Sequence, residues 1–210
     1  VITPDNATSL LKQDNYFTVV RLWKSSGFYD NVGFGNLKTA RIAGFNDVDG
    51  LFVPCMKTFC ATLEKQVEVS INQLKNQNAY VGIFWIDVQD PASWNYPGNF
   101  STHQQMVKQM VDKADSMGQE VGIYTSYDRW SQLVGKNYIG QQQLPLWDYM
   151  PDGHMNYQTF NRYGGWQSPY MKTYQTTGRA KVATGGIAEI VGAGLMEFLW
   201  GEGRREDPME

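Results

Sequence analysis

The chain has 210 residues, a formal net charge of -3 and a pI of about 5.4. Its length suits one domain with a substantial core, and its slightly acidic balance offers no general attraction to nucleic acid or to an anionic membrane. The apolar stretch 187–200 is too short to span a bilayer and carries Glu189 and Glu197. Nucleic-acid-binding and membrane-spanning classes are therefore not expected.

Segments typical of helices and strands alternate along the chain. The first helix is expected at 3–13, where Thr3 is the N-cap and Pro4 is the first helical residue. A later helix, 101–118, is expected to begin at a Ser101 or Thr102 cap. The other expected helices are 36–44, 60–77 and 127–135, and the expected strands are 16–23, 47–54, 80–88, 119–126, 144–150, 168–175 and 185–191.

This order of elements predicts an α/β fold. Strands that alternate with helices form βαβ units in a parallel sheet, and about seven strands in a chain of this length favour a modified, irregular TIM-like β/α barrel. We expect a single domain at 1–200, followed by a charged tail at 201–210 that is disordered or artificial. No strand precedes a glycine-rich nucleotide-binding loop, so no cofactor is expected.

Cys55 and Cys60 are the two cysteines of the chain. Their spacing does not match a zinc motif, and no histidine is near them, so no metal site is expected. A local disulfide in an exported protein is favoured over two free thiols. Asn-x-Ser/Thr sequons at Asn6 and Asn99 are candidate glycosylation sites and also favour a secreted, extracellular protein.

The stretch "GIFWIDVQD", from Gly82 to Asp90, resembles a strand that leaves an apolar core and ends in polar side chains. Alternate residues of a strand face the same side, which places Asp87 beside Gln89, about 6–7 Å apart along the backbone. Two carboxylates at this spacing would indicate sugar hydrolysis. Here one member of the pair is an amide.

Six motifs carry a resemblance to a known family. They are "VVRLWKSSGFYD", "DVDGLFVPC", "GIFWIDVQDPASW", "GIYTSYDRW", "LPLWDYM" and "YGGWQSPYMKTY". Their order and spacing resemble the glycoside hydrolase family 25 lysozymes, in particular the branch of nematodes and amoebae. The resemblance implies a modified β/α barrel that cleaves the N-acetylmuramic acid to N-acetylglucosamine linkage of bacterial cell walls.

The resemblance also implies roles for particular acidic residues. In this family the glutamate of a D-x-E pair is the general acid, while the aspartate assists the substrate's acetamido group as internal nucleophile. Asp87 falls on the aspartate and Gln89 on the glutamate, whereas the family's first-strand aspartate falls upstream of Val1. Glu189 is the candidate for the acidic position near the C-terminus. A natural difference, an engineered change and a sequence uncertainty all remain open for Gln89.

Aromatic residues at strand ends are candidates for substrate binding. The resemblance places Tyr124 and Trp147 near the sugar groove, although packing within the barrel explains Trp147 nearly as well. Asp49 matches a recurrent acidic position, and a buried structural role is equally compatible with it. The complete set of candidates for substrate binding is Asp49, Tyr124, Trp147, Tyr149 and Trp166. The two histidines, His103 and His154, are expected to have capping or solvent-exposed roles.

Two function classes follow from these observations. The first is a secreted muramidase whose partner is bacterial cell-wall glycan or a related N-acetylated oligosaccharide, with activity reduced by Gln89. The second is a non-catalytic glycan-binding protein, or a structural or self-assembling protein, on the same scaffold. A glutamate at position 89 would favour the enzyme.

Overall fold

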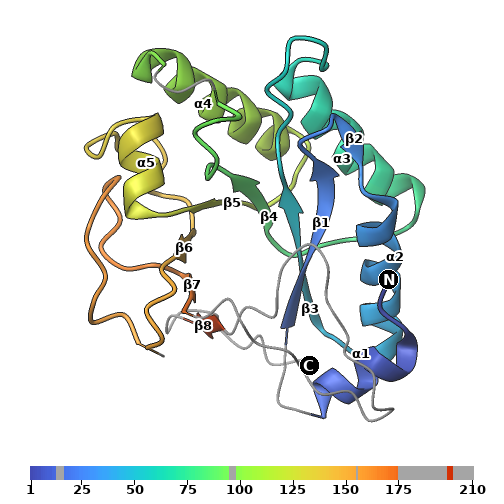
Figure 1. The fold of residues 1–210 in the computed structure, drawn as a ribbon. Helices are drawn as coiled ribbons and strands as arrows, with labels where there is room; N and C mark the ends of the chain where they lie inside the picture. The colour runs from blue at the N-terminus through green and yellow to red at the C-terminus, as the bar shows by residue number, and fades with distance from the viewer. Residues whose placement is uncertain (13–16, 95–97, 155, 175–197, 201–210) are drawn as a thin grey trace.

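A curled sheet forms the centre of the molecule (Figure 1). The computed structural model of the chain describes residues 1–12, 17–94, 98–154, 156–174 and 198–200. The sheet has the strand order β2-β1-β3-β4-β5-β6-β7-β8, in which β2 and β8 are antiparallel to their neighbours and all other pairs are parallel. The strands are β1 (Phe17–Lys24), β2 (Phe28–Tyr29), β3 (Asp47–Phe52), β4 (Phe84–Asp87), β5 (Val121–Thr125), β6 (Leu146–Tyr149), β7 (Met171–Thr173) and β8 (Phe198–Trp200).

Helices pack on the outer face of this sheet (Figure 1). They are α1 (Pro4–Leu11), α2 (Asn31–Ala43), α3 (Leu63–Asn76), α4 (Phe100–Ser116) and α5 (Tyr127–Leu133). The predicted start of α1 is confirmed, because the Thr3 side chain caps the helix and Pro4 is its first residue. The predicted caps of α4 are wrong. The Asn99 side chain accepts the Ser101 N–H instead and begins the helix earlier.

Helix α2 is longer than its sequence pattern predicted. It begins at Asn31 rather than at residue 36, because the Asp30 side chain accepts the Val32 N–H and caps the helix. Asp30 also forms an ion pair with Arg21 of β1 at 2.7 Å. Gly33 allows α2 to approach β1 closely, since a Cβ at this position would lie 1.7 Å from the Arg21 carbonyl oxygen. Helix and strand are thus joined at the beginning of α2.

The two faces of the sheet have separate cores. The larger core fills the space between the sheet and the helices and contains Phe84 and Ile86 of β4. The smaller core lies on the concave face and contains Trp85, together with residues from each of the other parallel strands. Its buried members are Val19, Leu51, Ile83, Trp85, Tyr124, Trp147 and Met171. Residues of β1 and β7 belong to one cluster because the sheet curls. The predicted alternation of β4 is confirmed.

Gly122 gives the concave core room for its largest side chain. A Cβ at Gly122 would lie 2.4 Å from the ring of Trp85, which is fully buried on the neighbouring strand. The edge of Trp85 packs against Trp147, with ring centroids 5.7 Å apart. The concave face below the strand ends is therefore filled by side chains.

The sequence patterns missed the two antiparallel strands. Strand β2 has only two residues and pairs with the end of β1, and β8 lies at 198–200. The strand predicted at 185–191 and the tail at 201–210 lie outside the described residues. The domain is mixed α/β, with the other predicted strands present and mostly shorter than their sequence patterns.

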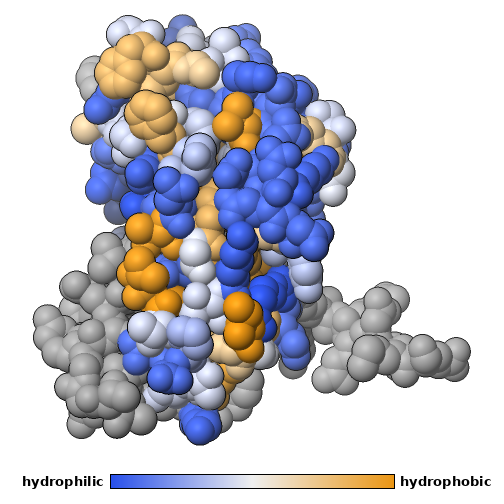
Figure 2. Space-filling view, turned by 90° about the vertical axis from the view of Figure 1, so that its right-hand side faces the viewer, coloured by the Kyte–Doolittle hydropathy of each residue, from blue (hydrophilic) through white to orange (hydrophobic). Residues whose placement is uncertain are grey.

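The loop after β3 carries the predicted disulfide, between Cys55 and Cys60. It packs against the turn that joins β1 to β2, where Gly27 has φ of 89° and an added Cβ would lie 2.9 Å from the Cys60 sulfur. Figure 2 views the side of α2 and α3, whose surface is mainly hydrophilic with scattered apolar side chains. In the described part of the chain, no helix is both long and apolar enough to cross a membrane.

Candidate active site

Asp87 is the last residue of β4 and lies half-buried at the carboxyl end of the sheet. It pairs with Tyr124 of β5 and belongs to the row of β4 side chains that face the concave side. Burial raises the pKa of Asp87 to about 7, and the negative charge of Asp90 adds to this rise. A hydrogen bond from the Gln89 backbone N–H to the carboxylate opposes it. Asp87 therefore changes charge near neutral pH.

Gln89 lies two residues after Asp87, just beyond the last backbone hydrogen bond to β5. The chain remains paired with β5 as far as Val88, whose N–H donates to the Tyr124 carbonyl at 2.9 Å. The Thr125 hydroxyl donates to the Val88 carbonyl at 2.7 Å and holds the backbone just before Gln89. The side-chain nitrogen of Gln89 is buried and lacks a hydrogen-bond partner among the described residues. Four other residues in the described part of the chain also have a buried polar atom without a partner, but Gln89 is the one beside Asp87, where its side-chain N–H can donate to an acceptor oxygen on a ligand.

Aromatic rings form the wall next to Asp87. Tyr124 stacks on Trp147, with centroids 3.9 Å apart, and Tyr149 contacts Tyr124 edge-on at 6.4 Å. Burial raises the pKa of the Tyr124 hydroxyl, and the nearby charge of Asp87 raises it further. Trp147 is fully buried, and its indole N–H donates to the Thr173 hydroxyl at 2.8 Å. Of these predicted sugar-binding residues, Tyr149 is therefore the most accessible. Trp147 is covered by the Tyr124 ring that stacks on it.

Asp49 lies deeper on the concave face. It is 3% exposed, and one carboxylate oxygen accepts the Ile83 N–H while the other accepts the Trp85 indole N–H, each at 2.9 Å. These bonds join β3 to β4 and hold the Trp85 ring in its orientation. The structure thus gives Asp49 the buried structural role that the sequence left open.

The structure does not bring every predicted site residue to Asp87. Trp166 is buried at the other end of the strands, where its indole N–H donates to the carbonyl of Leu144, just before β6. It packs edge-on against Trp130 of α5, with centroids 4.9 Å apart. Glu189 lies outside the described residues. The sequon residue Asn99 is exposed, whereas Asn6 is partly buried within α1.

The expected roles of the histidines need one correction. His103 is buried rather than solvent-exposed and does not cap α4. Its Nδ1 lies 2.8 Å from the Leu133 carbonyl oxygen, and its ring packs edge-on against Trp94. His154 is exposed, as expected. Across the described residues, no group of histidine, cysteine and acidic side chains could hold a metal ion.

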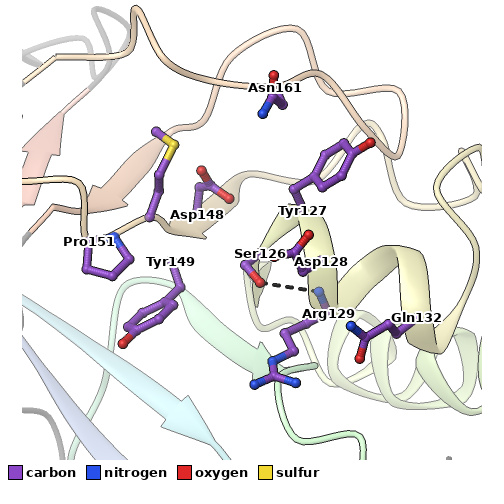
Figure 3. A pocket seen from close by; sticks show the side chains of 10 residues that line it. Ser126, Tyr127, Asp128, Arg129, Gln132, Asp148, Tyr149, Pro151 and Asn161 are labelled. Carbon is purple, nitrogen blue, oxygen red and sulfur yellow. Dashed lines mark hydrogen bonds between the residues drawn. The ribbon is translucent and has the colours of Figure 1, made fainter.

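A polar cleft of about 510 Å³ lies beside the aromatic wall. One side is formed by residues of α5 and the other by residues at the end of β6 (Figure 3). Ser126, Asp128, Arg129, Asp148 and Tyr149 are among its lining residues. The sequence analysis missed Asp148, although this residue stands in the motif "LPLWDYM" that carried part of the resemblance. An acidic residue between two aromatic ones was the available signal.

Asp148 is an almost completely buried carboxyl group. Burial raises its pKa to about 6, while a hydrogen bond from the Tyr163 hydroxyl at 2.7 Å and the positive charge of Lys172 oppose this rise. Asp148 and Lys172 are paired neighbours on β6 and β7. At pH 7 and above, Asp148 is therefore an anion beneath the cleft.

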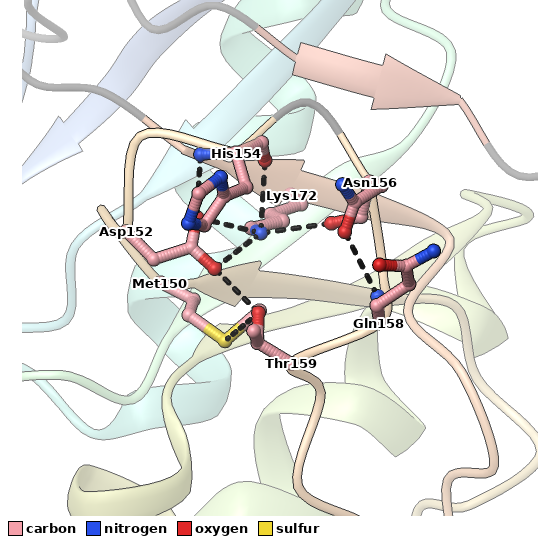
Figure 4. A network of polar contacts seen from close by, with 7 residues as sticks. All are labelled: Met150, Asp152, His154, Asn156, Gln158, Thr159 and Lys172. Carbon is pink, nitrogen blue, oxygen red and sulfur yellow. Dashed lines mark hydrogen bonds and ion pairs between the residues drawn. The ribbon is translucent and has the colours of Figure 1, made fainter.

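A buried lysine fixes the loop beyond the cleft (Figure 4). The Lys172 ammonium group donates to the Asp152 carboxylate at 2.8 Å and to the carbonyls of His154 and Asn156 at 3.1 and 2.8 Å. Burial alone would raise the pKa of Asp152, but hydrogen bonds from Lys172, Thr159 and the His154 N–H lower it to about 2. The loop that follows β6 is thus held by one internal cation.

Comparison with solved structures defines the class of protein to which this fold belongs. A muramidase from Acremonium alcalophilum aligns with a TM-score of 0.65 at 14% identity, covering 87% of this chain and 85% of that one. A family GH25 lysozyme from Aspergillus fumigatus aligns with a TM-score of 0.58 at 17% identity, covering 80% and 81%. The chain thus shares the fold of the glycoside hydrolase family 25 lysozymes.

Sequence comparison then gives the family itself. The model of the family described as "Lysozyme-like protein 1" matches residues 1–174. "Lysozyme-like protein 5" of Caenorhabditis elegans is 35% identical over 161 residues, which cover 77% of this chain and 74% of that protein. "Probable GH family 25 lysozyme 2" of Dictyostelium discoideum is 32% identical over 169 residues, covering 80% and 77%. The chain belongs to this lysozyme-like family, as its motifs predicted.

Proposed function

We propose that the protein is a secreted lysozyme-like protein that binds bacterial cell-wall glycan at the carboxyl end of the curled sheet. It cleaves the linkage between N-acetylmuramic acid and N-acetylglucosamine slowly. The observation that carries this proposal is Asp87, a half-buried carboxyl group with a pKa of about 7, at the end of β4 beside the Tyr124 and Tyr149 rings. Stacking on such rings and hydrogen bonding to polar strand ends suit an amphipathic sugar.

The reduced rate follows from the residue at position 89. A glycosidic oxygen leaves readily only when an acid protonates it, and an amide cannot supply that proton. The loss of a general acid lowers the rate about 10²–10⁴-fold. In this proposal, the ionised Asp87 assists the acetamido oxygen of the substrate as that oxygen attacks the anomeric carbon. The proton for the leaving group then comes from water.

We interpret the curled sheet as an irregular TIM-like β/α barrel whose mouth is the glycan site. The parallel order from β1 to β7 and the shared concave core support it. The disulfide between Cys55 and Cys60 and the exposed sequon at Asn99 support export from the cell.

A turbidity assay on bacterial cell walls tests this function. We expect slow clearing by the protein with Gln89, clearing at least about tenfold faster by Gln89→Glu, and none by Asp87→Asn. Clearing by the unchanged protein at the rate of Gln89→Glu would show that another residue supplies the proton. Equal clearing by Asp87→Asn would remove Asp87 from the mechanism.

The non-catalytic alternative also has a specific observation in its favour. The unpaired Gln89 side-chain nitrogen can donate to the carbonyl oxygen of an N-acetyl group, whereas an ionised glutamate at this position has no proton to donate. The Cpl-1 endolysin, whose fold aligns with a TM-score of 0.60, was solved as a glutamate-to-glutamine mutant in complex with a peptidoglycan analogue. Retained glycan binding with no clearing at any enzyme concentration would favour this alternative.

A further inference from the structure

The polar cleft adjoins the candidate glycan site through the contact between Tyr149 and Tyr124, and a charge effect of Arg129 on Asp90 agrees with this. Tyr149 lines the cleft and also touches Tyr124, the strand partner of Asp87. Arg129 lines the cleft from α5, and its positive charge contributes to a lowered pKa of Asp90, for which a hydrogen bond from Ser93 is the main cause. The cleft therefore lies next to the strand that pairs with the carboxyl end of β4.

The cleft offers groups of both charges. Asp148 is 2% exposed and provides a buried anion, and Asp128 is an exposed carboxylate on α5. The Lys172 ammonium group is directed to Asp152 and to two backbone carbonyls, so it does not take the place of a ligand at Asp148. Arg129 is exposed on α5, across the cleft from Asp148, and can bind a carboxylate with two parallel hydrogen bonds. A neutral sugar needs neither the two carboxylates nor the arginine.

We propose that this cleft binds the peptide part of peptidoglycan, through a residue that carries both a free ammonium group and a carboxylate. The ammonium group lies toward Asp148 and Asp128, and the carboxylate lies toward Arg129. This inference rests on the proposed function. In peptidoglycan the peptide branches from the muramic acid, so a glycan held at Asp87 delivers its peptide beside the site of cleavage. A volume of about 510 Å³ is within the usual range for binding sites of small ligands.

The test compares two ligands that differ only in the peptide. Isothermal titration at pH 7.5 is carried out with a muramyl disaccharide that bears a tripeptide ending in a diamino acid, and with the same disaccharide without peptide. We expect the peptide to increase affinity by about tenfold or more. Arg129→Gln and Asp148→Asn should each reduce the ratio of the two affinities to about 3 or less. Arg162→Gln, an exposed arginine on the next loop, is the matched control and should leave the ratio as it is.

The outcomes separate this inference from the proposed function. Equal affinity for the two ligands, or a ratio unchanged in both cleft variants, would overturn the peptide site while leaving the glycan site in place. If neither disaccharide binds, the proposed function is wrong. The free tripeptide, followed by NMR at millimolar concentration, then decides the inference. Shifts that disappear in Arg129→Gln support the cleft, and the absence of shifts overturns it.

Discussion

Two glutamines of this chain show how differently its polar groups are treated. Gln66 of α3 is fully buried, and its side chain makes four hydrogen bonds. It accepts from the Trp23 indole and the Cys55 N–H, and it donates to the carbonyls of Cys55 and Ala61. The side-chain nitrogen of Gln89, also buried, has no partner among the described residues.

The ionisable groups repeat this contrast. Lys172 lies buried with three acceptors around its ammonium group, whereas Asp87 lies at the strand end with a pKa raised mainly by burial. The polar groups of the Gln66 and Lys172 side chains all have hydrogen-bond partners. At the carboxyl end of β4 hydrogen bonding is incomplete, and stability is lower than it would be with apolar groups. Other buried groups without a partner, such as the Trp130 indole N–H and the Ser70 hydroxyl, lie elsewhere in the described structure, so the position of Gln89 two residues after Asp87 is what points to a ligand site.

The largest expected effect concerns Lys172, whose hydrogen bonds are complete. Lys172→Met leaves the Asp152 carboxylate and the carbonyls of His154 and Asn156 without their cation. We expect the free energy of unfolding in urea to fall by about 3–5 kcal/mol. Lys108→Met, which breaks only the exposed pair with Asp112, should cost less than about 0.5 kcal/mol. A similar small loss in both variants would contradict the role given to Lys172.

The second prediction concerns Asp87, whose substitution should raise the free energy of unfolding rather than lower it. The folded-state pKa of Asp87 is about 7 against an ordinary value of 3.8, so the unfolded chain loses its proton first as pH rises. Asp87 therefore destabilises the folded state progressively between pH 4 and 7, and fully above pH 7. Asp87→Asn should raise the free energy of unfolding by as much as about 4 kcal/mol at pH 8 and by little at pH 4. Urea unfolding at both pH values measures this, and a gain equal at the two would contradict the raised pKa.

The third prediction tests the two glutamines directly. Gln66→Met removes four hydrogen bonds and strands their buried partners, which should cost about 3 kcal/mol. Gln89→Met removes an unpaired donor and should change stability by less than about 1 kcal/mol in either direction. Thermal unfolding of the two variants side by side measures the difference. A loss at Gln89 as large as that at Gln66 would mean that the Gln89 side chain holds the fold.

The sequence predicted the placement of the β4 side chains, because there a local pattern determines the structure. Alternation along β4 places Trp85 and Asp87 on one face whatever surrounds them, so "GIFWIDVQD" was sufficient. It failed where long-range packing decides. Nothing local shows that Trp166 packs against Trp130 at the far end of the strands, or that Asp148 lines a cleft with Arg129. The Asn99 cap of α4 was missed because Ser101 and Thr102, which follow it directly, are also favoured capping residues.

The order of strands in the sheet has a consequence for the synthesis of the chain. Strands β3 to β7 each pair in parallel with the parallel strand that precedes them in sequence. A ribosome adds about 5–20 residues per second, so each new strand emerges within seconds beside a partner that already exists. Asp87 emerges before Tyr124 and Trp147, and its strand is an open edge until β5 follows. The chain thus assembles its polar strand end first and encloses it in aromatic rings afterwards.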